Sequence, residues 1–279
     1  MHKTFWPDGA RLVISISMQF EAGSQPDRGA YSPYGDFDPG LPNPAIDKWF
    51  QYGVKEGLPR LLDLWDRKNV KVTSHMVGKA VEASPALARE IVERGHEAAG
   101  HGYEWVPHHR MTPDEERASY KDGADIIERV TGTRPVGFNA FALRGTENTL
   151  GILKDLGYIY HIDDISRDEP FLVNVNGGPF CVVPYTRRNN DIERFHTPAT
   201  TVAAWLGDLK EEFDQLYEEA GHRRRLMSVS THDRIGGQPA PTRALGRFID
   251  YAQSHPGVVF MRKDDIARFA LEDPDTIRE

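Results

Sequence analysis

The sequence predicts an α/β fold with a parallel sheet and a barrel-like number of repeating units. Short apolar strands alternate with amphipathic helices along its 279 residues, which is the pattern of successive strand–helix–strand units. That length and an apolar fraction of 39% fit one large domain spanning residues 1–279.

Hydrophobic periodicity predicts the first elements. An apolar run at 12–20 predicts the first strand, and a second strand is expected at 70–77. A helix is expected between them, because apolar side chains recur at i, i+3, i+4 and i+7 and therefore share one face. Those side chains are Leu58, Leu61, Leu62 and Trp65.

Capping signals and apolar runs predict the remaining elements. Ser84 and Thr112 each precede a proline, and Glu115 completes a capping box in the second case, so helices are expected to begin there. Gly157 is expected to end another helix as its C′ residue. Two long helices are expected from about Val202 and from about Thr242. The other strands are expected at 97–101, 136–139, 158–162, 227–231 and 258–261.

Charge and cysteine content narrow the class of partner. The formal net charge is −8 with interspersed signs, which argues against nucleic acid and against an anionic membrane surface. Cys181 is the only cysteine, so no intrachain disulfide can form. The chain starts without a signal-peptide core, and no run approaches the roughly 20 apolar residues of a membrane span. We expect a cytoplasmic protein that acts on a small molecule.

The long irregular stretch at 23–44 is rich in Gly, Pro, Asp and Tyr. It follows the first strand directly and therefore leaves from the carboxyl end of the sheet, where parallel α/β folds place their sites. Loops of this length are usually functional or disordered. We interpret it as a lid over the site, with surface decoration as the alternative.

Two strands carry small polar side chains on one face. In the first strand Ser15, Ser17, Gln19 and Glu21 alternate with apolar residues, and a later strand repeats the pattern with Ser228, Ser230 and His232. In a closed barrel that face is the interior, and its upper rim is the usual active site. The alternative is that the serines fill a tight interior and that Glu21 and His232 are solvated strand ends.

The histidine-rich segment 94–105 supplies a third candidate. His101 stands between two glycines that let a ligand approach the backbone, whereas His96 fits a structural corner. His101 is therefore the functional candidate of the two.

Taken together, these segments resemble a known family. The segment 95–105 (GHEAAGHGYEW) resembles the second signature of the NodB-like polysaccharide deacetylases, and 230–234 (STHDR) resembles the last. The stretch 232–239 and the groups Pro184-Tyr185-Thr186 and Asn190-Asp191 resemble most closely the metal-independent bacterial allantoinase and cyclic imide hydrolase branch. The resemblance covers nearly the whole chain and implies a deformed (β/α) barrel of about seven parallel strands.

The resemblance also assigns family roles to positions. In metal-dependent members a first-strand Asp is the base, a second Asp joins two histidines on the metal, and a late His is the acid. The matching residues here are Gln19, Glu21, His101, Trp105 and His232. Gln19 cannot accept a proton and Trp105 cannot bind a metal, so too few of the usual ligands remain for a catalytic metal. We therefore predict no metal and no other cofactor.

The implied chemistry is hydrolysis of a C–N bond in a cyclic ureide, an imide or an N-acyl compound. Amide hydrolysis without a metal needs a base, an acid and a stabiliser of the oxyanion. We predict Glu21 as the base, His232 as the acid and His101 as the residue that stabilises the oxyanion or orients water. Asp163 and Asp164 are expected either to orient a histidine or to cap a loop. Substrate-binding candidates are Gln19, Trp105, Arg144, Tyr185 and Arg234.

Alternatives to this function remain open at the level of sequence. The loop 138–148 differs from the allantoinase branch, which makes allantoin itself a doubtful substrate. One alternative is a metal-dependent deacetylase of an N-acetylated sugar or polysaccharide. Another is a non-catalytic ligand-binding relative, which the replacement at Gln19 favours and the retention of Glu21, His101 and His232 opposes. Relatives suggest a homo-oligomer.

Overall fold

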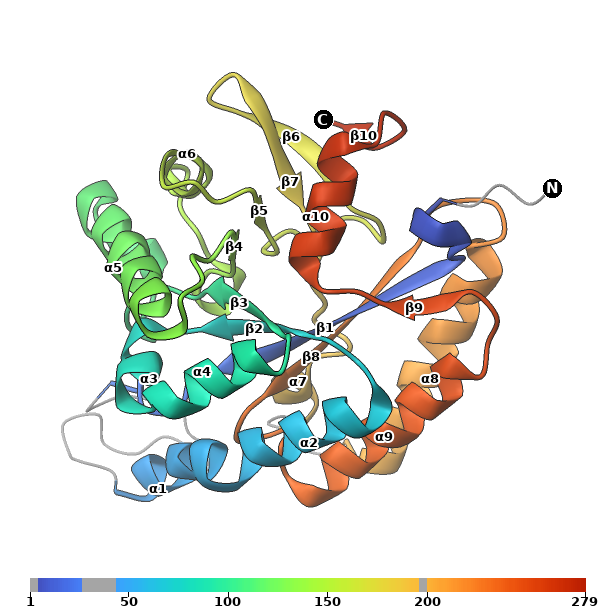
Figure 1. Ribbon diagram of the computed structural model, residues 1–279, viewed down its shortest axis with the longest axis horizontal. Coiled ribbons are helices and arrows are strands. Elements are labelled where there is room, and N and C mark those ends of the chain that lie inside the picture. The colour runs from blue at the N-terminus through green and yellow to red at the C-terminus, as the bar shows by residue number, and fades with distance from the viewer. Residues whose placement is uncertain (1–4, 27–43, 196–199) are drawn as a thin grey trace.

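The strands form one mainly parallel sheet that curves into a deformed barrel (Figure 1). A computed structural model of the protein describes residues 5–26, 44–195 and 200–279. Its strands are β1 (Leu12–Phe20), β2 (Thr73–Met76), β3 (Glu97–Gly100), β4 (Gly137–Phe138), β5 (Tyr160–His161), β6 (Phe171–Val175), β7 (Gly178–Val182), β8 (Leu226–His232), β9 (Val258–Phe260) and β10 (Ile277–Arg278).

The main body of the sheet is a parallel run in the order β8-β1-β2-β3-β4-β5-β7. Strand β6 pairs antiparallel with β7 and parallel with β10, and β9 pairs with the first residues of β1. Beyond β7, a bridge between Asn190 and Ser230 connects the chain back to β8. The predicted barrel of about seven parallel strands is confirmed, and its deformation lies at this irregular seam.

Helices lie around the outside of the strands (Figure 1). They are α1 (Pro44–Tyr52), α2 (Leu58–Lys68), α3 (Gly78–Ala83), α4 (Pro85–Glu93), α5 (Pro113–Thr131), α6 (Thr149–Asp155), α7 (Asp191–Phe195), α8 (Val202–Glu219), α9 (Pro239–Gln253) and α10 (Lys263–Glu272). None of these described helices is both long and apolar enough to cross a bilayer. Most of the predicted lid at 23–44 lies outside the described residues.

The predicted periodicities match the packing. The apolar stripe of α2 is fully buried, and its Trp65 indole donates to the Met18 sulfur on the outward face of β1. The opposite face of β1 points inward, where Ser17 Oγ lies 3.4 Å from His75 Nε2. Period-two alternation therefore sorted the outward apolar side chains from the inward polar ones correctly.

One cap was predicted fully and another only in part. Thr112 and Glu115 form the reciprocal capping box of α5, with Thr112 N donating to Glu115 Oε2 at 2.8 Å. Helix α4 does begin at Pro85, but the Ser84 side chain makes no capping hydrogen bond. Proline alone therefore suffices to start α4, because its fixed φ and missing N–H suit the first helical position.

Strands β6 and β7 form a hairpin that was not predicted from the sequence. Its turn is Asn176-Gly177, with φ of 46° and 76°, which is the left-handed pair that an Asn-Gly hairpin turn requires. Strand β7 is needed to continue the parallel run beyond β5. The turn signal was present in the sequence, and the strand spacing alone did not reveal it.

A buried lysine lies among polar side chains inside the barrel, toward the amino ends of the strands. Lys263 Nζ donates to Ser15 Oγ at 3.2 Å, and Glu97 lies in the same cluster, accepting from Tyr160 Oη at 2.7 Å. Burial lowers the pKa of Lys263 from 10.5 to about 7, and the Glu97 carboxylate opposes this shift. Charging this amine therefore costs folding free energy.

Lys263→Met should remove a pH-dependent loss of stability. A depressed pKa of a base means that stability is fully present above the unfolded pKa and is lost as pH falls through the folded pKa. As pH falls from about 9 to about 7, the unfolding free energy of the wild type should therefore decrease relative to that of the variant by on the order of 2 kcal/mol. Urea unfolding at both pH values measures this, with the exposed Lys48→Met as control. Parallel pH profiles for wild type and Lys263→Met would contradict the assignment.

Candidate active site

A cavity of about 580 Å³ opens at the carboxyl ends of the barrel strands. Glu21 and His232 reach it from the ends of β1 and β8, and His101 and Asn139 from just after β3 and β4. The other lining residues are Gln19, Trp105, Phe141, Ala142, Leu143, Arg144, Asp163, Ile165, Tyr185, Arg187, Asn190, Ile192 and Glu193. A second hollow of about 590 Å³, between α5, α6 and the β6–β7 hairpin, contains no histidine or cysteine in its lining.

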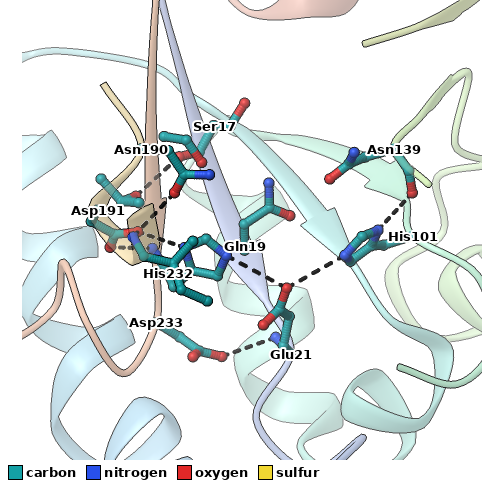
Figure 2. Close-up of polar contacts among 12 residues, drawn as sticks. Ser17, Gln19, Glu21, His101, Asn139, Asn190, Asp191, His232 and Asp233 are labelled. Carbon is teal, nitrogen blue, oxygen red and sulfur yellow. Dashed lines mark hydrogen bonds and ion pairs between the residues drawn. The ribbon is translucent and has the colours of Figure 1, made fainter. Parts of the chain in front are cut away.

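The Glu21 carboxylate lies between the two predicted histidines (Figure 2). Its Oε1 atom is 3.4 Å from His101 Nε2 and 3.7 Å from His232 Nε2. Its Oε2 atom accepts a hydrogen bond from Arg234 Nη1 at 2.7 Å. One oxygen is therefore fixed by a guanidinium, and the other faces the imidazoles.

Arg234 also sets the charge of Glu21. Burial on its own raises the pKa of the Glu21 carboxyl, but Arg234 and, after it, His232 and His101 lower it well below 4.5 overall. Favourable charges at hydrogen-bond distance thus outweigh desolvation. Glu21 is ionised across the working range of pH.

The prediction that Arg234 binds substrate needs correction. Arg234 is fully buried and lies outside the lining of the cavity, where it binds the Oε2 atom of Glu21. Its Nη1 atom also donates to Asp233 Oδ1 at 3.2 Å. The side chain can be buried there because the carboxylates of Glu21 and Asp233 compensate for its loss of water.

Asp191 orients the predicted acid. Its Oδ1 atom is 2.5 Å from His232 Nδ1, and its Oδ2 atom accepts from the backbone N–H groups of His232 and Gly236, each at 2.6 Å. Burial lowers the pKa of His232, the Asp191 and Glu21 carboxylates raise it, and the net shift is upward from 6.5. The proton on Nδ1 is fixed toward Asp191, which leaves Nε2 to face the cavity.

The backbone after β4 orients His101. Its Nδ1 atom lies 2.6 Å from the carbonyl oxygen of Asn139, so this nitrogen carries a proton and donates it. Asp163 holds the same segment by accepting from Asn139 Nδ2 at 2.8 Å and from Ala140 N at 2.9 Å. Asp163 therefore positions His101 indirectly, whereas Asp164 accepts from Ser166 N at 2.7 Å and caps a loop.

A polar group lines the inner wall beside the histidines. Gln19 Nε2 donates to Tyr185 Oη at 3.2 Å, and Tyr185 Oη also contacts Ser230 Oγ and Asn190 Nδ2. The Gln19 Oε1 atom is buried and has no hydrogen-bond partner among the described residues. It can therefore accept a hydrogen bond from an N–H or O–H group of a substrate.

The outer wall is partly apolar and its backbone is strained. Ala142 and Leu143 both have left-handed backbone conformations, with φ of 51° and 60°, which is costly for residues with a Cβ. The next residue, Arg144, lines the cavity, is exposed and makes no ion pair within the described parts of the chain. Ile165, which is 50% exposed, stands at the same mouth.

The side chains that line the cavity do not fit the divalent metal that metal-dependent members of the family bind. Within the described residues, no three His, Cys, Asp or Glu side chains are grouped so that they could hold a metal. The imidazoles of His101 and His232 approach Glu21 from opposite sides (Figure 2). Arg234 already binds the second oxygen of Glu21.

Two residues of the site, Asp191 and Asp233, had no predicted role. Asp191 was part of the motif Asn190-Asp191, and only the fold shows that it contacts His232. Asp233 follows His232 directly, and its Oδ2 atom accepts from Glu21 N at 2.9 Å and from Ala22 N at 2.8 Å. Both carboxylates fix the backbone at the ends of β1 and β8, which sequence spacing could not reveal.

Comparisons with known proteins agree with this architecture. The sequence profile of the family described as "Polysaccharide deacetylase" matches residues 41–161. The crystal structure of a "probable Polysaccharide deacetylase" from Pseudomonas aeruginosa PAO1 is 32% identical, with a TM-score of 0.90 and coverage of 96% of this chain and 94% of that one. Puue allantoinase is 31% identical, with a TM-score of 0.90 and coverage of 97% and 94%. The peptidoglycan deacetylase of Helicobacter pylori is 23% identical, over 76% of this chain and 82% of that protein.

The fold, the site and these likenesses define a hydrolase of carbon–nitrogen bonds other than peptide bonds. The chain belongs to the polysaccharide deacetylase family, on the evidence of 32% identity over 96% of its length.

Proposed function

We propose that the protein hydrolyses a C–N bond in a small cyclic ureide, imide or N-acyl compound, without a bound metal. The arrangement of Glu21 Oε1 between the Nε2 atoms of His101 and His232, at 3.4 and 3.7 Å, carries this proposal. A volume of about 580 Å³ suits a small ring. The likeness to Puue allantoinase supports a cyclic ureide or related ring as the substrate class.

Water attack is the step assigned to Glu21. The water oxygen forms a bond to the carbonyl carbon while its proton passes to Glu21 Oε1, and the carbonyl electron pair moves onto oxygen. The second oxygen of Glu21 stays bound to Arg234 throughout. The carboxylate is thereby held in one orientation and is ionised before the reaction begins.

Oxyanion stabilisation is the role assigned to His101. Its Nδ1 proton is committed to the Asn139 carbonyl, so only the charged imidazole presents an N–H at Nε2. That N–H then donates to the negative oxygen of the tetrahedral intermediate. A donor of this kind, fixed in advance, stabilises the transition state more than the ground state.

C–N cleavage is the step assigned to His232. As the intermediate collapses, the C–N electron pair moves to nitrogen, which takes the proton from His232 Nε2. The raised pKa of His232 keeps this proton in place until the bond breaks. Transfer of the proton from Glu21 back to His232 through solvent restores the starting state.

A hydrolysis screen tests the proposal. Cyclic ureides, imides and N-acetyl sugars would be assayed with and without a chelator, alongside measurement of metal content. We expect turnover of a small ring or N-acyl compound at an unchanged rate after chelation, and substoichiometric metal. One firmly bound metal per chain, with activity lost on its removal and turnover confined to N-acetyl sugars, would instead establish a metal-dependent sugar deacetylase.

A further inference from the structure

Arg234 occupies a site built for a cation beneath the active-site carboxylate. Its guanidinium carbon lies 4.1 Å from the ring centre of Phe50, 4.7 Å from that of Trp49 and 5.5 Å from that of Trp105. Aromatic faces at these distances attract a cation through their quadrupoles. Three rings from two segments that are far apart in sequence thus surround one buried charge, and we call Trp49, Phe50, Trp105 and Arg234 the Arg234 cage.

Close backbone packing holds the cage together. Trp49 and Phe50 belong to α1, which continues into a π-helical turn at Gly53–Gly57. A Cβ atom on Gly57 would lie 1.9 Å from the carbonyl oxygen of Asp233, so only glycine admits this approach. The wide turn therefore docks α1 against the loop that carries Arg234. π-Helical turns of this kind are frequent at functional sites.

The cage determines what the guanidinium can do. Arg234 Nη1 binds Glu21 and Asp233, while Nε and Nη2 have no hydrogen-bond partner among the described residues. The guanidinium of Arg234 thus packs against aromatic rings and binds Glu21 and Asp233, while two of its three nitrogens make no hydrogen bond to described residues. Trp105, at the position that matches a metal-binding histidine of the family, supplies one wall of the cage and also lines the cavity.

We propose that Arg234 is the resident cation of this active site, a positioning residue that holds Glu21 between the histidines and keeps divalent ions off that carboxylate. A divalent ion on Glu21 would lie within a few ångströms of a guanidinium that has little water around it to screen the repulsion. The proposal deepens the proposed function and rests on its assignment of Glu21 as the reacting carboxylate.

Cobalt(II) binding tests the exclusion of metal without an activity assay. Trp105→His supplies the missing family ligand, and we expect it to bind cobalt weakly while Arg234 remains. Trp105→His/Arg234→Met should bind cobalt tighter by roughly 10²–10⁴-fold, with visible d–d absorption, because the competing charge is gone. Trp105→His/Arg234→Lys keeps a cation and should behave like Trp105→His alone.

Each outcome decides the question. Tight cobalt binding by Trp105→His, or by its combination with Arg234→Lys, would overturn the exclusion of metal by Arg234. Weak binding by the combination with Arg234→Met would overturn it as well. If that protein does not fold, Arg234→Gln takes the place of Arg234→Met, because an amide can still donate to Glu21.

Kinetics on the substrate found in the screen separate positioning from direct binding. Arg234 does not line the cavity, so Arg234→Met should lower kcat with little change in KM, and Arg234→Lys should restore part of kcat. A rise in KM at constant kcat would show that Arg234 binds substrate and would refute the positioning role. If Glu21→Gln keeps full activity, the proposed function is wrong. The cobalt measurement still decides separately whether Arg234 excludes a divalent ion.

Discussion

Glu21→Gln should lower kcat by roughly 10²–10⁴-fold, the range typical for loss of a general base. The change nearly preserves volume but removes the proton acceptor that lies 3.4 Å from His101 Nε2. Substrate binding should change less, because the amide still fills the same space. Steady-state kinetics on the best substrate of the screen measures both parameters.

Two control measurements accompany the Glu21→Gln experiment. Glu104, a partly exposed carboxyl next to Trp105, pairs with Lys79; Glu104→Gln controls for the loss of a nearby negative charge and should retain full kcat. Unfolding by denaturant checks that the Glu21→Gln protein is folded. We expect it to be folded, because Arg234 keeps Asp233 as an ion-pair partner in that variant. A folded Glu21→Gln protein with wild-type kcat would move the base to His101 or elsewhere.

Asp191→Asn should reduce kcat by a comparable factor, roughly 10²–10⁴-fold, because a histidine whose orienting carboxylate becomes an amide can adopt the wrong tautomer. The Asp191 carboxylate contacts both the imidazole and the backbone N–H of His232. The amide keeps the size of that contact and loses its charge. His232→Ala should fall in the same range, since it removes the proposed acid itself.

The pH profile gives Asp191→Asn a second, independent signature. The acid must be protonated, so loss of the His232 proton, whose pKa lies above 6.5, should contribute to a fall in the activity of the wild type as pH rises. Burial lowers that pKa and the Asp191 carboxylate is the first group to raise it, so Asp191→Asn should move this alkaline limb to lower pH. An unmoved limb would assign the titration to another group.

The inward-facing part of the site was predictable because strand geometry has a strict period. Side chains at i and i+2 of a strand share a face, so Gln19 and Glu21 had to lie together, and parallel pairing places the end of β8 beside them. The observed register sets Gln19 opposite His232. The positions of these residues in one cavity followed from the sequence, although their catalytic roles remain for the kinetics to test.

Arg234 shows where that reasoning fails. Sequence places an arginine directly after His232 and suggests a substrate clamp, because arginines near active sites commonly bind carbonyls or carboxylates. Whether the side chain meets substrate or the protein interior depends on α1 and on Trp105, which reach it from remote parts of the chain. No local pattern encodes that burial.

The sequence by itself determined the α/β class, the first strand at Leu12–Phe20, the capping box of α5 and the inward face that carries Glu21 and His232. These depend on local periodicity and on contacts within a few residues. Only the tertiary structure decided that Asp191 orients His232, that Arg234 binds Glu21 from below, and that Asn190 bridges to β8 at the seam of the barrel. Those features join residues about 40 to 213 positions apart in the sequence. Whether such residues meet depends on how the whole chain packs and on which charged groups it buries away from water.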